Sequence, residues 1–380
     1  MCRTPVLPLF ASALGAGPRQ VGVVVAASTL TGIAIKLPAG ALSDVLGRRT
    51  LLVGGAIAFA LFPFGYLAVT ALASLVLLRF LHGAATATFG PVASAAISDI
   101  APPERRGAWL GWYSSIQSAG QALGPVLAGA LIAGDDFRLA FVVSGVIGLG
   151  ALITIAGRPA ALRRAQGVPR LSRDAVRRIA SAGRTEQFRI GIQQVIADRR
   201  IVITSVAQSG QFVVNGALNA FLPLYAKDRL GLTPAEIGLL FGIQTAVTLL
   251  ARPVLGAASD RAGRRPMIAA GLIGCGVAAW GFSYASSVSA VLLTAAAYGA
   301  SLGLATSATS AYVTDLARRA QYGAAHGVFG TIYDIGDAAG PIVAGFLVAG
   351  GGYAIMFRLV GTAAILLAVV FVTSIRPRSG

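Results

Sequence analysis

The chain repeats one long unit of sequence at a constant offset of 216 residues. Residues 40–49 read GALSDVLGRR, and residues 256–265 read GAASDRAGRR. The same offset, without a gap, relates further pairs, among them Pro18 and Pro234, Gly22 and Gly238, Asp99 and Asp315, Gly107 and Gly323, and Gly129 and Gly345. A period of this length is far too long for a solenoid or propeller repeat. The chain should therefore fold as two halves built on one plan.

The composition indicates whether these halves fold in water or in a lipid bilayer. With 56% hydrophobic and 12% charged residues and a mean hydropathy of +0.75, the chain has more apolar surface than a water-soluble core can hide. Runs of about twenty residues with few charges recur, each long enough to cross a bilayer as a helix. Eleven spans are expected, at 20–43, 51–71, 73–98, 108–133, 139–157, 201–226, 235–258, 267–285, 288–313, 323–349 and 353–375. The sequence predicts an all-α integral membrane protein embedded in lipid.

The net charge of +17 is unevenly distributed. If the spans alternate sides, 22 of the 31 Lys and Arg residues fall on one side of the membrane, which is the pattern that marks the cytoplasmic face. A nucleic-acid partner would need a contiguous basic face on a soluble domain, so we expect no nucleic-acid binding. The sequence instead predicts a multi-pass protein of the cell membrane, with its central loop and C-terminus in the cytoplasm.

An Arg-rich, weakly apolar segment separates the two halves. We therefore divide the chain into a first transmembrane bundle at 1–157, a basic cytoplasmic linker at 158–200 and a second transmembrane bundle at 201–380. Residues 172–197 fit an amphipathic helix lying on the anionic cytoplasmic leaflet. A solvated tether between the bundles is the alternative.

The first helix of the first half is expected to be truncated. Leu7 to Phe10, before Pro18, matches only the tail of the span that precedes Pro234 in the second half. About a dozen apolar residues are too few to cross a bilayer. The features of a cleaved signal peptide are also lacking, so a start codon placed too far downstream is the favoured explanation.

Nothing in the sequence predicts bond-breaking chemistry. Cys2 and Cys275 lie in different halves without redox or metal-ligand spacing, and His82 and His326 are isolated. The phosphate-binding loop, the nucleophile elbow and the zinc-protease motif do not occur. We expect no enzyme activity, no cofactor and no metal site.

The paired Gly-x-x-x-Asp-x-x-Gly-Arg-Arg loops and the long basic middle loop resemble those of the major facilitator superfamily. The resemblance implies two pseudo-symmetric six-helix bundles, the first helix being truncated in this chain. Residues 5–8 and Arg79-x-x-x-Gly83 resemble the first- and fourth-helix motifs of the twelve-helix drug:proton antiporters. The antiporter motif of the fifth helix is matched by Gly111, Gly120, Gly124, Pro125, Ala128 and Gly129, with Ala128 in place of a glycine.

The paired loops are expected to gate the cytoplasmic side. Their residues are Gly40, Asp44, Gly47, Arg48, Arg49 and Asp99 in the first half, and Gly256, Asp260, Gly263, Arg264, Arg265 and Asp315 in the second. We expect ion pairs from Arg48 to Asp99 and from Arg264 to Asp315. Each loop aspartate would also approach the positively polarised N-terminus of a helix in the other half and latch that side shut. Tight turns with topology-fixing arginines are the alternative.

The Gly-Pro segments predict close helix packing. Gly120 and Gly124, like Gly336 and Gly340, form small-residue faces that let helices approach. Pro125 and Pro341 each remove a backbone hydrogen bond and should kink their helices. The resemblance implies that this packing seals the bundle against proton leak. Plain helix packing is the alternative.

Polar residues inside spans are candidates for a substrate path, because burying them in lipid is costly. One stripe follows the seventh helix and another the fourth; they comprise Gln208, Gln211, Asn215 and Asn219, and Arg79, His82 and Thr86. The resemblance implies that the first, fourth, seventh and tenth helices line a cavity, so both stripes are candidate substrate-binding residues. Helix–helix hydrogen bonds are the alternative for a polar residue in a span, and Arg79 could instead extend to the outer membrane interface.

Asp334 and Asp337, one turn apart on the eleventh helix, are the best candidates for proton coupling, which requires a titratable group in the transport path. The alternatives are an ion pair with Lys36 or Arg252, or a proton carrier in the first helix. The sequence as a whole predicts a monomeric secondary transporter that exports a small amphiphilic or drug-like molecule in exchange for protons by alternating access, with the proton gradient as its energy source. An uptake symporter or uniporter for a polar metabolite is the first rival, and a non-transporting receptor or assembly factor the second.

Overall fold

The computed structural model describes most of the chain outside the linker. The described ranges are 4–46, 48–132, 136–157, 193, 195–317 and 322–375, and their side chains are described except at 36–46, 103 and 322–324. The amphipathic helix expected within 172–197 therefore lies almost entirely outside the described residues. The same holds for Gly47 and for the side chain of Asp44, and Gly40 is described only as a residue of the second helix.

The described part of the chain is helical and has no β-strand. The first copy forms α1 (Val6–Ala13), α2 (Pro18–Leu46), α3 (Arg48–Gly65), α4 (Leu72–Ile100), α5 (Arg106–Ala130) and α6 (Arg138–Ala156), with one-turn helices η1 (Tyr66–Ala68) and η2 (Pro103–Arg105). The second copy forms α10 (Arg199–Leu230), α11 (Pro234–Ala262), α12 (Arg264–Tyr284), α13 (Val288–Leu316) and α14 (Tyr322–Ser374). Each of the eleven expected spans corresponds to a helix, the last two being joined in α14.

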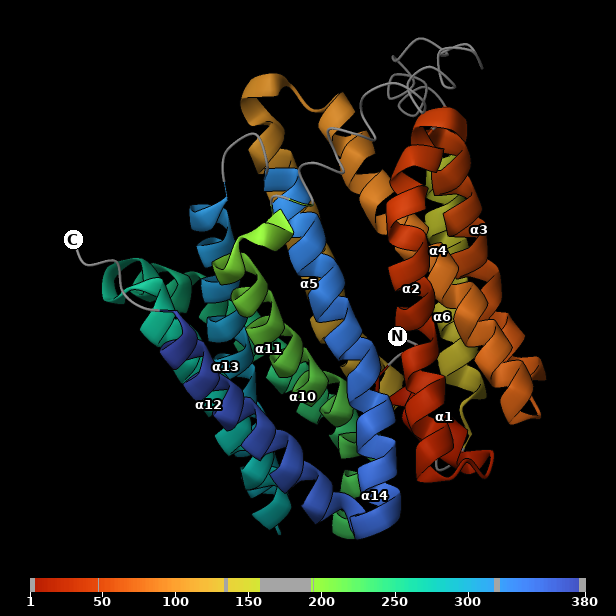
Figure 1. The fold of residues 1–380 in the computed structure, drawn as a ribbon. Helices are drawn as coiled ribbons and strands as arrows, with labels where there is room; N and C mark the ends of the chain where they lie inside the picture. Colours follow the sequence, from red (N-terminus) through yellow and green to blue (C-terminus); the bar gives the residue numbers. More distant parts are fainter. Residues whose placement is uncertain are drawn as a thin grey trace.

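Two elements depart from a simple one-helix, one-span pattern. Helix α14 contains two helices joined at Gly352, whose φ of 78° is a left-handed conformation that favours glycine, and it folds back on itself in Figure 1. Among the described residues, nine helices are long and apolar enough to span a membrane, and α5 is not one of them. Ser114, Gln117 and Gln121 lower the hydropathy of α5, yet it packs against α11 like the other bundle helices.

The chain alternates direction from helix to helix, so basic residues collect at one end of the molecule. Helices α3, α5, α10 and α12 each begin with an arginine there, and we call this the basic end and the other the opposite end. In Figure 1 the basic end is uppermost. Within the first bundle α2 packs on α4 and α3 on α6, and within the second α10 and α12 pack on α14 and α11 on α13. The most extensive contacts between the bundles are those of α2 with α14 and of α5 with α11, and smaller contacts link α10 to α1 and to α2.

The bundles meet most closely at the opposite end, where glycines bring backbones together. A Cβ atom added to Gly238 of α11 would lie 2.5 Å from the carbonyl oxygen of Pro125 in α5, and one added to Gly22 of α2 would collide with that of Pro341 in α14. These two contacts are related by the 216-residue offset. The repeat thus uses one glycine–proline crossing twice to close this end.

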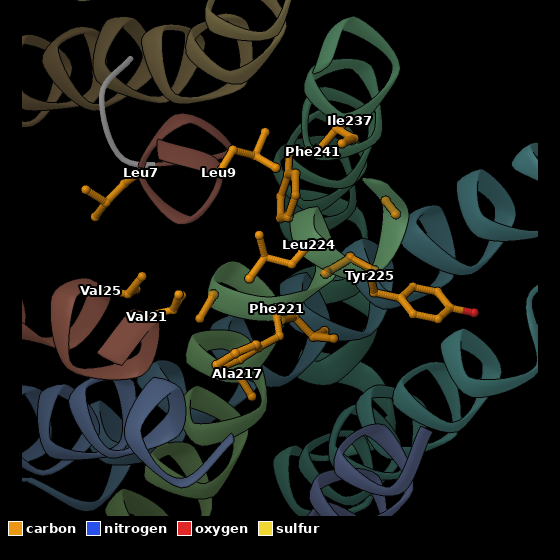
Figure 2. Packing of buried hydrophobic residues seen from close by; sticks show 14 of the residues in the cluster. Leu7, Leu9, Val21, Val25, Ala217, Phe221, Leu224, Tyr225, Ile237 and Phe241 are labelled. Atoms are coloured by element: carbon orange, nitrogen blue, oxygen red, sulfur yellow. The ribbon is translucent and has the colours of Figure 1, made fainter. Parts of the chain in front are cut away.

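A second pair of crossings follows the same rule. An added Cβ on Gly345 would lie 2.7 Å from the carbonyl oxygen of Pro18, and one on Gly129 would collide with that of Pro234. Apolar side chains from α1, α2, α10 and α11 surround this region in one buried cluster that includes Leu9 and Phe241, as Figure 2 shows. The structure is therefore closed at the opposite end.

Candidate functional site

A cavity of about 590 Å³ lies at mid-depth in the first bundle, on the side that faces α14 of the second bundle. Its walls come from α2, α3, α4 and α6 of the first bundle and from α14 of the second. The lining includes Ser28, Thr29, Phe59, Arg79, His82, Thr86, Phe89, Ile155, Asp334 and Asp337. Ile155 lies one residue before the end of α6, at the basic end. Among the residues whose side chains are described, the lining combines aromatic and aliphatic groups with one guanidinium, one imidazole and two carboxylates.

Arg79 is held inside the first bundle. Its side chain is only 3% exposed, and Nη2 donates a hydrogen bond to Ser28 Oγ on α2. The neighbouring Gly83 permits this approach, because a Cβ there would lie 2.5 Å from the carbonyl oxygen of Ser28. Arg79 therefore does not extend to the membrane interface; it faces the cavity.

His82 and Thr86 line the same wall of the cavity. His82 Nδ1 lies 3.3 Å from Tyr66 Oη, and its ring packs against Phe59 and Phe62 at centroid distances of 5.8 Å. Thr86 Oγ1 donates to the His82 carbonyl oxygen at 3.0 Å. The fourth-helix stripe expected from the sequence thus lies on the cavity wall as a unit.

Asp337 connects the two bundles. Thr29 Oγ1 of α2 donates to Asp337 Oδ2 at 3.3 Å, and Asn215 Nδ2 of α10 donates to Asp337 Oδ1 at 3.3 Å. Asp334 lies one turn nearer the basic end, and both side chains are buried. The side chain of Lys36 lies outside the described residues, and Arg252 is exposed. A change in the bundle-to-bundle contact would therefore disturb the hydrogen bonds of Asp337.

The seventh-helix stripe does not line the cavity as a unit. Gln208 is buried in the second bundle, where its Oε1 accepts a hydrogen bond from Thr309 Oγ1. Gln211 is buried one turn further on and donates from Nε2 to the Leu302 carbonyl oxygen at 3.2 Å. Asn215 reaches Asp337, and Asn219 is half-buried. The expectation of a cavity-lining stripe is wrong for the two glutamines, because α10 is enclosed by α12, α13 and α14 and its polar face meets those helices.

The expected ion pairs of the paired loops are confirmed. Arg48 pairs with Asp99, and Arg264 Nε lies 3.0 Å from Asp315 Oδ2. Arg264 also pairs with Asp260, so this aspartate binds within its own bundle and not at the N-terminus of α5. Among the described residues, every ion pair at the basic end joins groups of one bundle. The Asp260 half of the cross-bundle latch is therefore not formed, and the side chain of Asp44, which would form the other half, lies outside the described residues.

The remaining loop residues form turns and lateral contacts. Gly263 has a φ of +92° between α11 and α12, which requires glycine in this tight turn. Arg265 Nη2 donates to the Val372 carbonyl oxygen at 3.2 Å, Arg49 is half-buried, and Gly256 is in ordinary contact with Ser307.

The Gly-Pro segments are packed differently in the two halves. Added Cβ atoms on Gly336 and Gly340 of α14 would collide with the backbone of α10. Gly124 is also buried, but a Cβ on Gly111 or Gly120 would meet nothing within 4 Å. The prediction of close helix packing is therefore wrong for Gly111 and Gly120. Pro125 and Pro341 lie within continuous helices, and their carbonyl oxygens form the bundle-to-bundle crossings described above.

Comparison with known proteins decides the family. The family model described as Major Facilitator Superfamily matches residues 2–228 and again residues 204–380. The chain belongs to the major facilitator superfamily. As a member of this superfamily it is a multi-pass membrane transporter for small molecules, and its fold of two pseudo-symmetric helical bundles is the one that the sequence predicts.

Individual relatives add detail to this assignment. The chain is similar to the uncharacterised MFS-type transporter MJ1560 of Methanocaldococcus jannaschii, at 24% identity over 96% of this chain and 92% of the relative. It is also similar to the quinolone resistance protein NorA of Staphylococcus aureus, at 30% identity over 39% of this chain and 38% of NorA.

Two solved structures share the superfamily fold across almost the whole chain. A bacterial homologue of the human lysosomal transporter Spinster, in an inward-facing and unoccupied conformation, superposes with a TM-score of 0.79 at 16% identity, covering 97% of this chain and 90% of the other. The nucleoside transporter NupG superposes with a TM-score of 0.75 at 13% identity, covering 97% and 93%.

Sequence reasoning missed several residues of the site. Thr29 and Ser28 are single hydroxyls in an apolar run, and the aromatic wall of Phe59 and Phe89 resembles any lipid-facing stretch. Tyr298 is the equivalent of His82 in the second copy, but it is buried in the second bundle and is not among the lining residues.

Proposed function

We propose that this protein exports a small amphiphilic or drug-like molecule in exchange for protons, by alternating access, with Asp337 as the main proton carrier and Asp334 as its neighbour. The observation that carries the proposal is the position of Asp337, a buried carboxylate on the cavity wall that binds a hydroxyl of one bundle and an amide of the other. The proton gradient is the energy source, and no cofactor, metal or bond-breaking step is involved.

The closed end indicates from which side of the membrane the cavity is reached in this state. Positive residues favour the cytoplasmic side, so the basic end, the central loop and the C-terminus face the cytoplasm of a cell-membrane protein. The opposite end is sealed by the glycine–proline crossings. In this state a molecule from the cytoplasm enters the cavity, and a single chain contains both bundles that the exchange requires, so a monomer suffices.

Protonation of Asp337 changes the contact between the bundles. The carboxylate accepts hydrogen bonds from Thr29 and Asn215 on opposite sides of the bundle interface. A protonated carboxyl has one fewer strong acceptor oxygen, so proton binding weakens one of these links. A proton taken up from outside and later released to the cytoplasm would therefore first weaken and then restore a hydrogen bond of Asp337.

The cavity chemistry supports an amphiphilic substrate. Phe59, Phe89 and the ring of His82 offer flat aromatic surfaces, and Asp334, Asp337 and Arg79 add charged groups to the same lining. A ligand with an aromatic body and a basic group fits this combination of groups. The partial similarity to NorA agrees with this reading, whereas the nucleoside transporter shares the fold alone.

The test measures lumenal pH in everted vesicles that carry the protein and are energised to an acid interior. A panel of cationic drugs and neutral metabolites is added, and compound-triggered proton loss is expected for the cationic amphiphiles. Asp337→Asn should abolish it, with Asp334→Asn giving a smaller loss. Asp228→Asn is the matched control, because Asp228 accepts from Tyr353 Oη at 2.8 Å near the opposite end, away from the cavity.

Two outcomes would overturn the proposal. Proton loss that persists in the Asp334/Asp337 double variant would place the carrier on another residue. Uptake of a polar metabolite that survives collapse of the gradient, without proton loss for any cationic compound, would replace export by facilitated uptake on the same fold.

A further inference from the structure

Four buried polar side chains lie on α10 and α13 inside the second bundle. We call this the α10–α13 seam and define it by Gln208, Gln211, Tyr298 and Thr309. Its first rung is the hydrogen bond from Thr309 to Gln208. Its second is the bond from Gln211 Nε2 to the carbonyl oxygen of Leu302, four residues beyond Tyr298 on α13. Because the two helices are antiparallel, the seam runs from mid-depth toward the basic end.

The seam contains three polar atoms that the protein leaves without a hydrogen bond. They are Gln208 Nε2, Gln211 Oε1 and Tyr298 Oη, and their side chains are 1%, 0% and 0% exposed. Exchanging the amide nitrogen and oxygen of either glutamine would satisfy no more atoms, because each amide has one end toward its partner and one end away. Buried polar atoms are rarely left unpaired, since each carries the desolvation cost of its lost partner.

Water is the ligand that these three atoms fit. The set offers two donor hydrogens from an amide, one acceptor oxygen from an amide, and a phenol that donates and accepts. A buried water molecule needs two to four such partners in a polar site. An organic ligand would need an opening, and the seam residues are enclosed by the helices of one bundle.

The seam continues to the proposed proton carrier. Asn215, one turn beyond Gln211 on α10, donates to Asp337. Tyr298 lies on α13 one turn before Leu302, whose carbonyl oxygen accepts the hydrogen bond from Gln211. The polar side chains of α10 therefore lead from Asn215, which is bonded to Asp337, through Gln211 to Gln208.

We infer that the α10–α13 seam binds a short file of water molecules that carries protons between Asp337 and the basic end, separately from the substrate cavity. The step is a relay: Asp337 releases one proton to the first water, and each water accepts one proton and passes one on, so every molecule ends unchanged. A separate route lets Asp337 exchange its proton while a bulky substrate fills the cavity. The transport role rests on the proposed function, but the hydration of the seam does not.

Hydration is tested by X-ray hydroxyl-radical footprinting of the purified full chain in detergent, which labels side chains beside bound water. Tyr298 should be labelled several-fold faster, relative to its intrinsic reactivity, than the buried Tyr225 and Phe282. Tyr225 is the matched control because its hydroxyl is already bonded to the Ala285 carbonyl oxygen at 2.9 Å. Labelling of Tyr298 no faster than these controls would overturn the inference, whether or not the protein exchanges protons.

The relay is tested with Tyr298→Phe, which removes one oxygen atom and keeps the ring. Compound-triggered proton release should slow roughly 10-fold to 100-fold, the range for a lost proton-transfer group, with drug affinity unchanged, and Tyr225→Phe should match the wild type. Gln211→Leu should act like Tyr298→Phe.

A hydrated Tyr298 with full proton release in both variants would overturn the relay and leave structural water. Absence of proton release in the wild type would count against the proposed antiport, and the footprinting result would still stand.

Discussion

The two bundles share one sequence plan but differ at their centres. In the second bundle α10 lies against α14 so closely that Gly336 and Gly340 have no room for a Cβ. In the first bundle Gly120, the equivalent of Gly336, faces open space. The described helix of the first bundle that corresponds to α10 is α1, whose eight residues cover only the opposite end.

In the first bundle, the cavity occupies the position that α10 takes in the second bundle. Phe59 lines the cavity, and its equivalent Cys275 accepts a hydrogen bond from Gln211 of α10 at 3.8 Å. Ala151 also lines it, and its equivalent Leu367 touches Gly210 of α10. Equivalent positions of the repeated unit therefore face a cavity in one half and a central helix in the other. A central helix, more than the local sequence, decides whether a polar residue is available to a ligand.

The largest expected effect concerns these paired glycines. Gly336→Val should lower the free energy of unfolding by about 3 kcal/mol, because the side chain must displace the backbone of α10. Gly120→Val, the same change at the equivalent position, should stay within about 0.5 kcal/mol. Thermal unfolding in detergent measures both. Equal losses would show that the first bundle is as tightly filled as the second.

The next effect concerns closure at the opposite end, where both bundles contribute alike. Gly129→Val should prevent the α5–α11 crossing and shift the population toward the form open at that end by about tenfold, or about 1.4 kcal/mol. The reporter is a cysteine at Thr86, an exposed residue of the cavity wall, in a chain with Cys2 and Cys275 replaced by alanine. Labelling by a membrane-impermeant maleimide from the basic-end side should fall.

The control for that experiment is Gly120→Val, which meets open space on the same helix. Its labelling should equal that of the parent. Gly345→Val, the equivalent of Gly129 at the α2–α14 crossing, should reproduce the loss. A loss at only one of the two glycines would mean that the repeated crossings are not equivalent in closing the molecule.

The sequence was sufficient for the fold because its signals are local or periodic. Helix positions follow from apolar runs, and the Arg48–Asp99 and Arg264–Asp315 pairs follow from the repeat. The sequence was insufficient where a helix is surrounded on several sides. Periodicity places Gln208 on one face of α10, but which neighbour covers that face depends on the packing of the whole bundle.

A smaller effect separates the two loop arginines. Arg264 bonds three groups, Asp260, Asp315 and Ser259, whereas the described ion pair of Arg48 is with Asp99 alone. Arg264→Gln should therefore destabilise the protein more than Arg48→Gln, by up to about 1 kcal/mol against about 0.5 kcal/mol, since both pairs are partly exposed. Thermal unfolding at low and high salt checks this, and salt should narrow the difference. A larger loss for Arg48→Gln would reverse the ranking.

The smallest expected effect concerns the equivalent starts of α2 and α11. In the second copy Thr233 and Glu236 form a full capping box, with Thr233 N donating to Glu236 Oε2 at 2.8 Å and Glu236 N to Thr233 Oγ1 at 3.3 Å. In the first copy only half of it exists, the bond from Gly17 N to Gln20 Oε1 at 2.9 Å. Exchanging the capping residues should move stability in opposite directions by a few tenths of a kcal/mol, Thr233→Gly down and Gly17→Thr up. Replicate chemical denaturation measurements of the free energy of unfolding resolve such shifts. A lower free energy of unfolding in both variants would mean that the backbone at Gly17 does not accept a side-chain cap.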